Sequence, residues 1–192
     1  EGELWAAIDY SQQEPRILTH YASVFGRWKG LPLGGAKEFV DGYTNNPNMD
    51  FHTMVADMAN ISRKQAKTIN LGMMYGMGVR KLADQLDLEF EDAKELTQQY
   101  HSRVPFVKEL MNGVSRSVDQ KDDGSLRSLK GRKCRFDMFE PMGYDIQKAM
   151  PLKEAKATYG ETAPLKRAYT YKALNRLIQA SAADMTKQAM VD

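Results

Sequence analysis

The stretch from residue 63 to residue 75 carries four side chains whose spacing could serve a phosphate-bearing ligand. Arg63, Lys67, Leu71 and Tyr75 follow one another at intervals of four residues, so on a helix they share one face. Two cations would then stand at the start of the helix, where the backbone dipole also favours a phosphate. Further along, an apolar side chain and a ring could pack against a sugar and a base. A basic surface turn followed by ordinary core packing is the alternative, and the spacing by itself favours that simpler interpretation.

A second candidate is the carboxylate of Asp9. The apolar run over residues 4–8 predicts a short buried strand, 4–9, that ends at this aspartate. A carboxylate at a strand end could bind a hard divalent cation such as Mg²⁺, which takes oxygen ligands and keeps waters or substrate phosphates in its other positions. A single aspartate in this place more often caps a turn. Asp9 taken alone therefore leaves both interpretations open.

A third candidate is a pair of amides, Asn175 and Gln179, which lie four residues apart and share one face of a predicted helix. Amides can donate hydrogen bonds to the acceptors that every base pair offers in the minor groove, so they can check pair geometry without reading sequence. Two exposed polar residues would have the same spacing, and by spacing alone that interpretation is preferred.

The remaining pattern predicts a mostly helical α+β fold that would position these groups. Ser62 and Gln65 form a capping-box pattern, which predicts a helix over 63–75. Residues 124–136 combine glycines with partial alternation, which is typical of a hairpin. Residues 140–166 are poor in aliphatic side chains and hold three prolines, which predicts an irregular insertion. The other expected elements are helices over 14–25, 50–60, 82–86, 92–118 (interrupted around Pro105) and 167–191, and a loop over 26–35.

The composition is that of an ordinary globular protein. Charged residues make up 27% and hydrophobic residues 42% of the 192 residues, and no apolar run approaches the roughly 18 residues of a membrane helix. A net charge of +2 does not by itself indicate a nucleic-acid partner. The single cysteine, Cys134, indicates a reduced, cytoplasm-like compartment. The chain opens on Glu-Gly-Glu and stops at Asp192 within a helical pattern, so we expect a piece of a longer protein rather than a processed precursor.

These candidates occur in an order that resembles the family A DNA polymerases, the DNA polymerase I family with its bacterial and bacteriophage members. DYSQQEPR at 9–16 looks like the first catalytic motif of that family, usually written DYSQIELR. RKQAKTINLGMMYG at 63–76 is similar to the second motif, of the form RxxxKxxxFxxxYG. DFHT at 50–53 resembles the DIH segment ahead of that motif, and NRLIQASAADMTKQAM at 175–190 resembles the segment that runs up to the third motif. Together the matches cover most of the chain, and the first two are highly specific.

The resemblance implies a fold and a function. The chain would be a partial polymerase palm with an inserted helical fingers subdomain, of the α+β class and mostly helical. Residues 1–25 would carry the first motif in the palm, residues 26–166 would form mainly the fingers, and residues 167–192 would be a palm helix. The function would be that of a DNA-directed DNA polymerase, a nucleotidyltransferase. Its partners would be primer–template DNA and deoxynucleoside triphosphates, with no membrane, in the cytoplasm (of the host if viral).

The resemblance also implies a metal site. Asp9 would ligate two Mg²⁺ ions, with the backbone carbonyl of Tyr10 as a further ligand. One ion would lower the pKa of the primer 3′-hydroxyl, and the other would steady the pyrophosphate leaving group. Lys67 would join Asp9 as a catalytic residue, because its charge offsets that of the phosphates in the transition state.

Other roles follow from the same resemblance. Glu14 would be the steric gate that leaves no room for a ribose 2′-hydroxyl, and Tyr75 would lie beside the templating pair. The triphosphate would be contacted by His52 and the two helix cations. The residues implied to bind the nucleotide are Tyr10, Ser11, Gln12, Glu14, His52, Arg63, Lys67, Leu71 and Tyr75, and those implied to touch DNA are Arg132, Asn175 and Gln179.

The sequence departs from the family pattern at several positions. Leu71 stands where the family usually has Phe or Tyr, which predicts altered discrimination at the sugar. Gln13 and Pro15 replace an apolar pair of the first motif; Pro15 fits a helix start, but the sequence offers no reason for Gln13. Tyr171 stands where many members carry a basic residue, so one contact with the primer backbone is in doubt.

The third motif of the family, a His-Asp-Glu trio, does not occur in the sequence. The histidines are His20, His52 and His101, and none precedes Asp-Glu. We therefore expect the second metal carboxylate to lie beyond residue 192. With one such carboxylate of two, the isolated chain should bind nucleotide weakly and polymerise poorly or not at all.

Three other interpretations compete with a DNA polymerase. A single-subunit RNA polymerase shares the Arg/Lys/Tyr-Gly helix pattern, but Glu14 in its SQxE context argues against an enzyme that must admit a 2′-hydroxyl. A non-catalytic nucleic-acid-binding module would not need Asp9, Arg63 and Lys67 together. A purely structural helical domain would require every motif match to be chance.

Overall fold

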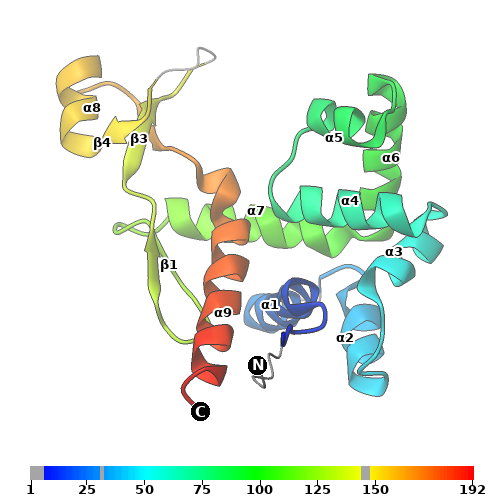
Figure 1. Cartoon of the computed structure of the whole chain (residues 1–192). Coiled ribbons are helices and arrows are strands. Elements are labelled where there is room, and N and C mark those ends of the chain that lie inside the picture. The colour runs from blue at the N-terminus through cyan, green and yellow to red at the C-terminus, as the bar shows by residue number, and fades with distance from the viewer. Residues whose placement is uncertain (1–6, 31–32, 144–147) are drawn as a thin grey trace, which may run out of the picture.

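The computed structural model describes residues 7–30, 33–143 and 148–192 of the chain. Helices dominate these residues, and the strands form two small antiparallel sheets, so the predicted mostly helical α+β class is confirmed (Figure 1). No helix in the described ranges has the length and apolar character needed to cross a membrane.

Three long helices make up the centre of the molecule. They are α1 (Gln13–Lys29), α7 (Pro105–Asp119) and α9 (Ala173–Ala189), and each contacts the other two. The apolar face of α7 is buried between its neighbours through Phe106, Val107, Leu110, Val114 and Val118. Where α1 crosses α7, Gly113 leaves space for Phe25, because a Cβ at that glycine would lie 2.2 Å from the ring Cζ.

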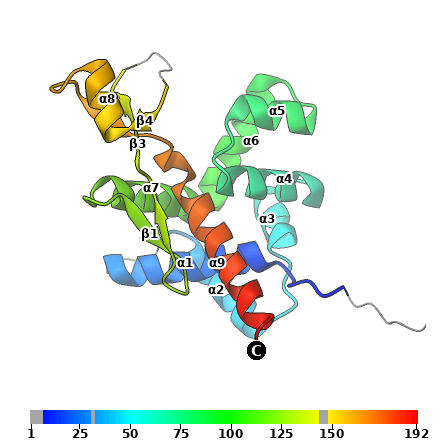
Figure 2. The same ribbon diagram turned by 60° about the vertical axis from the view of Figure 1, so that its left-hand side comes forward.

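A second group of helices packs on one side of α7 (Figures 1 and 2). It consists of α3 (Phe51–Ala59), α4 (Arg63–Met74), α5 (Val79–Leu86) and α6 (Phe90–Arg103), while α2 (Ala36–Asn45) packs against α1. The rings of Phe39, Phe51 and Phe106 join α2, α3 and α7, with centroids 4.8 Å apart for the first pair and 5.2 Å for Phe39 and Phe106. This aromatic contact fixes the start of α3 relative to the central helices.

The predicted hairpin is confirmed. Strands β1 (Ser125–Arg127) and β2 (Lys133–Arg135) pair antiparallel, with Leu126 opposite Cys134. The hairpin contacts α9, so its position is set by the central helices.

The expectation of an irregular insertion over 140–166 is wrong. The described residues of this stretch take part in a three-stranded antiparallel sheet of order β4-β3-β5 and include one short helix. The elements are β3 (Met138–Pro141), β4 (Met150–Pro151), α8 (Leu152–Tyr159) and β5 (Leu165–Arg167). The prolines misled the prediction because they lie at element boundaries, where no ladder hydrogen bond is lost: Pro141 and Pro151 end strands, and Pro164 precedes β5.

The expected buried strand over 4–9 is also wrong where it can be compared. Residues 4–6 lie outside the described residues, and residues 7–10 form no strand. Ile8 is 94% exposed. Neither sheet of the described chain includes residues 7–9, so Ile8 has no neighbouring strand to pack beside.

Several helix boundaries differ from the prediction. The loop expected over 26–35 is partly helix, because α1 continues to Lys29 and ends at Gly30 with φ 70°. The interruption expected around Pro105 is confirmed: α6 ends at Arg103 and Pro105 opens α7, where its missing N–H costs nothing. The final helix begins only at Ala173, after β5 and the short 3₁₀ helix η1 (Thr170–Lys172).

Candidate functional site

The helix α4 begins as its sequence predicts. Ser62 Oγ accepts a hydrogen bond from the backbone N–H of Gln65, and Gln65 Oε1 accepts from the N–H of Ser62. This capping box places Arg63 in the first turn and Lys67 one turn later. Lys67 is exposed and makes no hydrogen bond or ion pair with another described residue, so its charge is available to a ligand.

Arg63 is held by an acid at the start of α3. Its Nε and Nη2 donate to Asp50 Oδ2 at 2.9 and 2.6 Å, while Asp50 Oδ1 accepts from the backbone N–H groups of His52 and Thr53. Burial raises the pKa of the Asp50 carboxyl, but the bonds from Arg63 and from the two N–H groups outweigh it, and the pKa is lowered. One carboxylate thus caps α3 and ties it to α4.

The imidazole of His52 lies between α3 and α4. Its side chain is buried, and Nδ1 is 3.1 Å from the amide nitrogen of Asn70 on α4. Burial lowers the pKa of His52; Arg63 and Lys67 lower it further, while Asp50 and Glu14 oppose the shift. His52 is therefore a neutral imidazole at pH 7, set among the charges of the candidate site.

Three segments that are distant in the sequence meet at Glu14. Glu14 Oε1 accepts hydrogen bonds from Tyr75 Oη at 3.2 Å and from Gln179 Nε2 at 2.7 Å, and Gln179 Nε2 also lies 2.9 Å from Tyr75 Oη. We call these three residues the Glu14 cluster. Burial and the nearby Glu14 charge raise the pKa of Tyr75, so its hydroxyl stays protonated. The cluster links the start of α1, the end of α4 and the middle of α9.

Two neighbouring glutamines, Gln12 and Gln13, tie the start of α1 to α2, α3 and α9. Gln12 Nε2 donates to the Met49 carbonyl at 2.7 Å, and its Oε1 accepts from the Phe51 N–H at 2.8 Å and the Tyr43 hydroxyl at 3.2 Å. Gln13 Nε2 donates to the Ala182 carbonyl at 3.1 Å, which accounts for a residue that the sequence left unexplained. The amide of Gln12, which the resemblance assigned to the nucleotide, is thus occupied by contacts with α2, α3 and the loop between them.

Asp9, Tyr10 and Ser11 lie exposed just ahead of α1. The Asp9 carboxylate makes no hydrogen bond or ion pair with another described residue, and the carbonyl of Ser11 accepts from Arg16 Nε at 3.0 Å. Within the described ranges, no three His, Cys, Asp or Glu side chains come together to hold a metal ion. Asp9 can therefore offer an ion hard oxygen ligands but not a complete set.

The guanidinium of Arg132 docks the hairpin on α9. Its Nε donates to Asp184 Oδ1 and its Nη2 to the Ala180 carbonyl, both at 2.8 Å. Ser128 donates to the other oxygen of Asp184. The bond from Ser128 and the charge of Arg132 lower the pKa of Asp184. The guanidinium of Arg132 is thus already paired within the protein, whereas the resemblance implied that it contacts DNA.

The other predicted residues lie along the same faces. Asn175 is half-buried one turn before Gln179 and has no hydrogen-bond partner among the described residues. Leu71 is half-buried and packs against the core. Tyr171 packs against the turn after α4, where Gly76 has φ 68° and a Cβ would lie 3.2 Å from the Tyr171 ring. Tyr171 therefore has a packing role at the end of the candidate nucleotide helix.

Sequence reasoning missed Asn70, Asp50 and the docking role of Gln12. Asn70 is buried in the middle of α4, and a polar residue on the buried face of a helix was the signal that could have drawn attention to it. The partners of Asp50 and Gln12 depend on how the helices pack, which the spacing does not contain.

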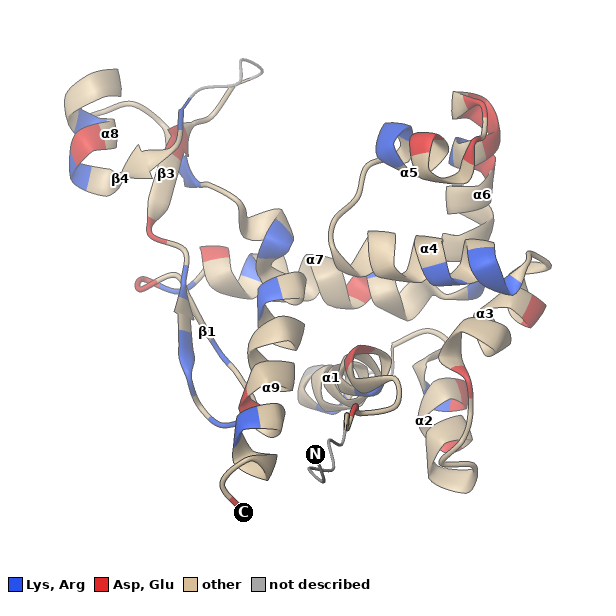
Figure 3. Ribbon diagram, viewed as in Figure 1, with Lys and Arg blue, Asp and Glu red and all other residues tan. Residues whose placement is uncertain are grey.

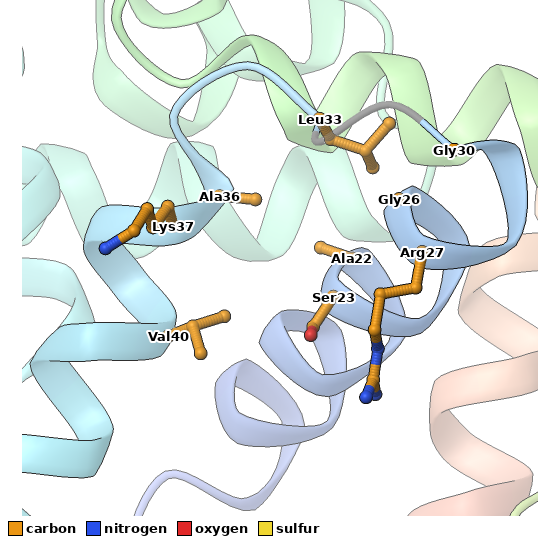
Figure 4. Close-up of a pocket in the computed structure, with 9 residues that line it drawn as sticks. All are labelled: Ala22, Ser23, Gly26, Arg27, Gly30, Leu33, Ala36, Lys37 and Val40. Atoms are coloured by element: carbon orange, nitrogen blue, oxygen red, sulfur yellow. The ribbon is translucent and has the colours of Figure 1, made fainter.

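An apolar pocket of about 410 Å³ lies between α1 and α2, away from these residues (Figure 4). Ala22, Leu33 and Val40 line it, and Arg27 and Lys37 stand at its rim. None of its lining residues belongs to α3, α4 or α9. Figure 3 shows Lys and Arg along α4, the hairpin and the first half of α9, whereas acidic residues gather at the start of α6.

Comparison with known proteins gives consistent matches. The model of the family described as DNA polymerase family A matches residues 1–192. A DNA-directed DNA polymerase of Pseudomonas phage M6 is 35% identical and aligns with the whole of this chain and 30% of its own length. The DNA polymerase I of Geobacillus stearothermophilus is 28% identical over 97% of this chain and 18% of its own.

Among solved structures, the chain is similar to the POL domain of Pol1 from M. smegmatis in a complex with DNA primer-template and dNTP. The TM-score is 0.64 at 26% identity, and the match covers 95% of this chain and 28% of that one. The chain thus spans less than a third of each of these relatives.

Proposed function

The chain belongs to DNA polymerase family A, and on this basis we propose that it forms part of an enzyme that extends a DNA primer by template-directed addition of deoxynucleotides. The observation that carries the proposal is the Glu14 cluster, in which hydrogen bonds join the three segments that resemble polymerase motifs. The reaction would take place in the cytoplasm, of the host if the gene is viral, as expected for relatives from phages and bacteria.

The triphosphate of the incoming nucleotide binds along the start of α4. Lys67 is exposed and has no partner among the described residues, and Arg63 exchanges its bonds with Asp50 for bonds to phosphate oxygens. His52 adds a neutral donor. In a site from which water is excluded, these donors offset the negative charge that develops on the phosphates during transfer. Fingers formed mainly by residues 26–166 would then close on a palm formed by residues 1–25 and 167–192.

Glu14 acts as the gate at the sugar. Tyr75 and Gln179 both donate to one of its oxygens, so the carboxylate is held in one place and can exclude a 2′-hydroxyl. Leu71 lies on the same helix as Tyr75 and offers the sugar an apolar surface without a ring. Tyr75 itself closes the site beside the templating base.

The minor-groove edge of the primer–template contacts α9 through Asn175 and Gln179. The amide of Asn175 makes no hydrogen bond within the described part of the chain, whereas Gln179 is already bonded to Glu14 and Tyr75. A mispaired terminus that displaces Gln179 would therefore also disturb the gate. Arg132 fixes the hairpin on α9, the helix that carries Asn175 and Gln179. A contact of Arg132 with the DNA backbone would involve the exposed atoms of its side chain.

Two Mg²⁺ ions would be bound by Asp9 and the carbonyl of Tyr10, together with nucleotide phosphates and groups outside the described residues. The exposed carboxylate of Asp9 fits this use, since hard cations prefer oxygen ligands. When bound, such ions lower the pKa of a primer 3′-hydroxyl and neutralise phosphate charge. The contribution of this chain is to hold Asp9 next to the helix that carries Glu14.

Equilibrium binding of a fluorescent dATP analogue to the chain tests the proposal, with Mg²⁺ present. Lys67→Ala is expected to weaken binding about tenfold or more, the value of one charge-assisted hydrogen bond. Lys64→Ala is the matched control, because Lys64 is an exposed lysine on the same helix, and its loss should change affinity by less than about twofold. Equal effects of the two substitutions, or no binding by the wild-type chain, would contradict the proposal.

A further inference from the structure

A buried amide on α4 contacts the imidazole that the proposed function assigns to the triphosphate. Asn70 is 1% exposed and His52 is 7% exposed, and the Asn70 Nδ2 and His52 Nδ1 atoms are 3.1 Å apart. Eighteen residues separate the two positions, so the contact exists only because α3 packs on α4.

The other half of the Asn70 amide is unpaired. Its Oδ1 is one of the buried polar side-chain atoms without a hydrogen-bond partner in the described part of the chain. Burying an unpaired carbonyl oxygen costs stability, and a leucine of similar size would avoid that cost. The value of an asparagine at this position therefore lies in what its Nδ2 does to His52.

The direction of that hydrogen bond fixes the proton of the imidazole. An amide nitrogen only donates, so Nδ1 of His52 accepts, and the proton of the neutral ring is on Nε2. Nε2 makes no hydrogen bond with another described residue. Part of its surface is exposed to solvent. It is therefore an N–H donor that has no partner in the described chain and is not completely buried.

We propose that Asn70 is a positioning residue that orients His52 and keeps its proton on Nε2, so that His52 donates a hydrogen bond to a phosphate oxygen of the bound nucleotide. The proposal rests on the proposed function for the identity of the ligand. The assignment of the proton rests on the geometry of α3 and α4 alone.

The charges around His52 explain the use of a neutral donor. Arg63 and Lys67 on α4 disfavour a third cation, while Asp50 at the start of α3 and Glu14 on α1 favour one. Burial decides the balance in favour of the neutral ring. A neutral His52 can donate a hydrogen bond to the phosphate without being repelled by Arg63 and Lys67. It can do so only if Nε2 carries the proton.

Long-range ¹H–¹⁵N NMR spectra of the chain test the assignment without any ligand. The sequence has three histidines, so His52→Gln identifies the His52 ring pattern, and the patterns of His20 and His101 are internal references. We expect the wild-type ring to be protonated on Nε2 at pH 7.5 and Asn70→Leu to abolish this fixed preference. Asn70→Asp, whose carboxylate only accepts, should move the proton to Nδ1. A wild-type ring protonated on Nδ1, or an Asn70→Leu ring unchanged from wild type, would overturn the proposal.

A double-mutant cycle tests whether Asn70 acts through His52. With dATP and Mg²⁺, Asn70→Leu is expected to weaken binding by about three- to tenfold in the wild-type background and by less than about 1.5-fold in the His52→Gln background. Asn112→Leu, the same change at an exposed position of α7, should have no effect. Equal losses in both backgrounds would reduce Asn70 to a structural residue and overturn the proposal.

The NMR spectra and the binding cycle test the role of Asn70 separately from the proposed nucleotide site. If the wild-type chain does not bind dATP, the proposed nucleotide site fails and the phosphate contact of His52 fails with it. The control of the proton by Asn70 is then still decided by the NMR spectra.

Discussion

The carboxylate of Asp50 has two separable tasks, and substitutions can divide them. Its Oδ1 caps α3 through the N–H groups of His52 and Thr53, and its Oδ2 pairs with Arg63. Asn is as good an N-cap as Asp, so Asp50→Asn removes only the ion pair. Asp50→Ala removes both interactions.

The expected magnitudes follow from exposure. The side chains of Arg63 and Asp50 are 57% and 30% exposed, so water screens the pair, and its loss should cost about 0.5–1 kcal/mol. Loss of the cap should add about 1 kcal/mol. For a chain of this size each kcal/mol shifts the Tm by about 2–4 °C, so we expect decreases of about 1–4 °C for Asp50→Asn and about 3–8 °C for Asp50→Ala.

Thermal and urea unfolding of the chain measure these effects, with Asp57→Asn, an exposed acid on the same helix, as the control. The pKa of Asp50 is lowered from 3.8 in the folded protein. Its ion pair therefore stabilises the fold above pH 3.8 and is lost as the pH falls through the folded pKa. The difference between wild type and Asp50→Asn should vanish in that acidic range and shrink in high salt.

A cycle with Arg63→Gln isolates the pair itself. Arg63→Gln should cost about 0.5–1 kcal/mol near pH 7 in the wild-type background and almost nothing in the Asp50→Asn background, which corresponds to a positive coupling free energy between the two side chains. If Asp50→Asn destabilised the chain as much as Asp50→Ala, or if the coupling were zero near pH 7, the two-task account would be refuted.

Three further predictions concern packing and specificity. Gly113→Ala should destabilise the chain by about 1–3 kcal/mol in urea unfolding, because its Cβ would overlap the Phe25 ring; an unchanged midpoint would contradict the close crossing of α1 and α7. Glu14→Ala in the polymerase that carries this chain should raise ribonucleotide incorporation relative to deoxynucleotide incorporation at least about tenfold, and an unchanged ratio in primer extension would reject the gate. Leu71→Phe should change dideoxynucleotide incorporation, and the idea fails if incorporation and turnover stay the same.

The sequence predicted those features that depend on local chemistry. The capping box of Ser62 and Gln65 placed the start of α4 correctly, because both partners lie within one turn. The hairpin over 124–136 was also found, since glycines and alternation are local signals. The spacing predicts which residues share a face of α4, and the resemblance to a polymerase motif implies a nucleotide on that face, which stays a prediction.

Features that depend on packing could not be predicted. The small sheet within 138–167 is formed by short strands that contain few aliphatic residues. Its prolines look like loop residues in the sequence, because only the structure shows that they lie at the ends of strands. The pairing of Asp50 with Arg63 and of Asn70 with His52 requires α3 to lie against α4. Nothing in the spacing of these residues fixes that arrangement.

The central claim is that the nucleotide binds on α4, and photo-crosslinking locates it most directly. The chain would be irradiated with an azido-substituted dATP and Mg²⁺, and the labelled peptides identified by mass spectrometry, with unlabelled dATP as competitor. The account predicts competed labelling within residues 63–76. Labelling confined to the pocket between α1 and α2 (Figure 4), or labelling that dATP does not compete, would contradict it.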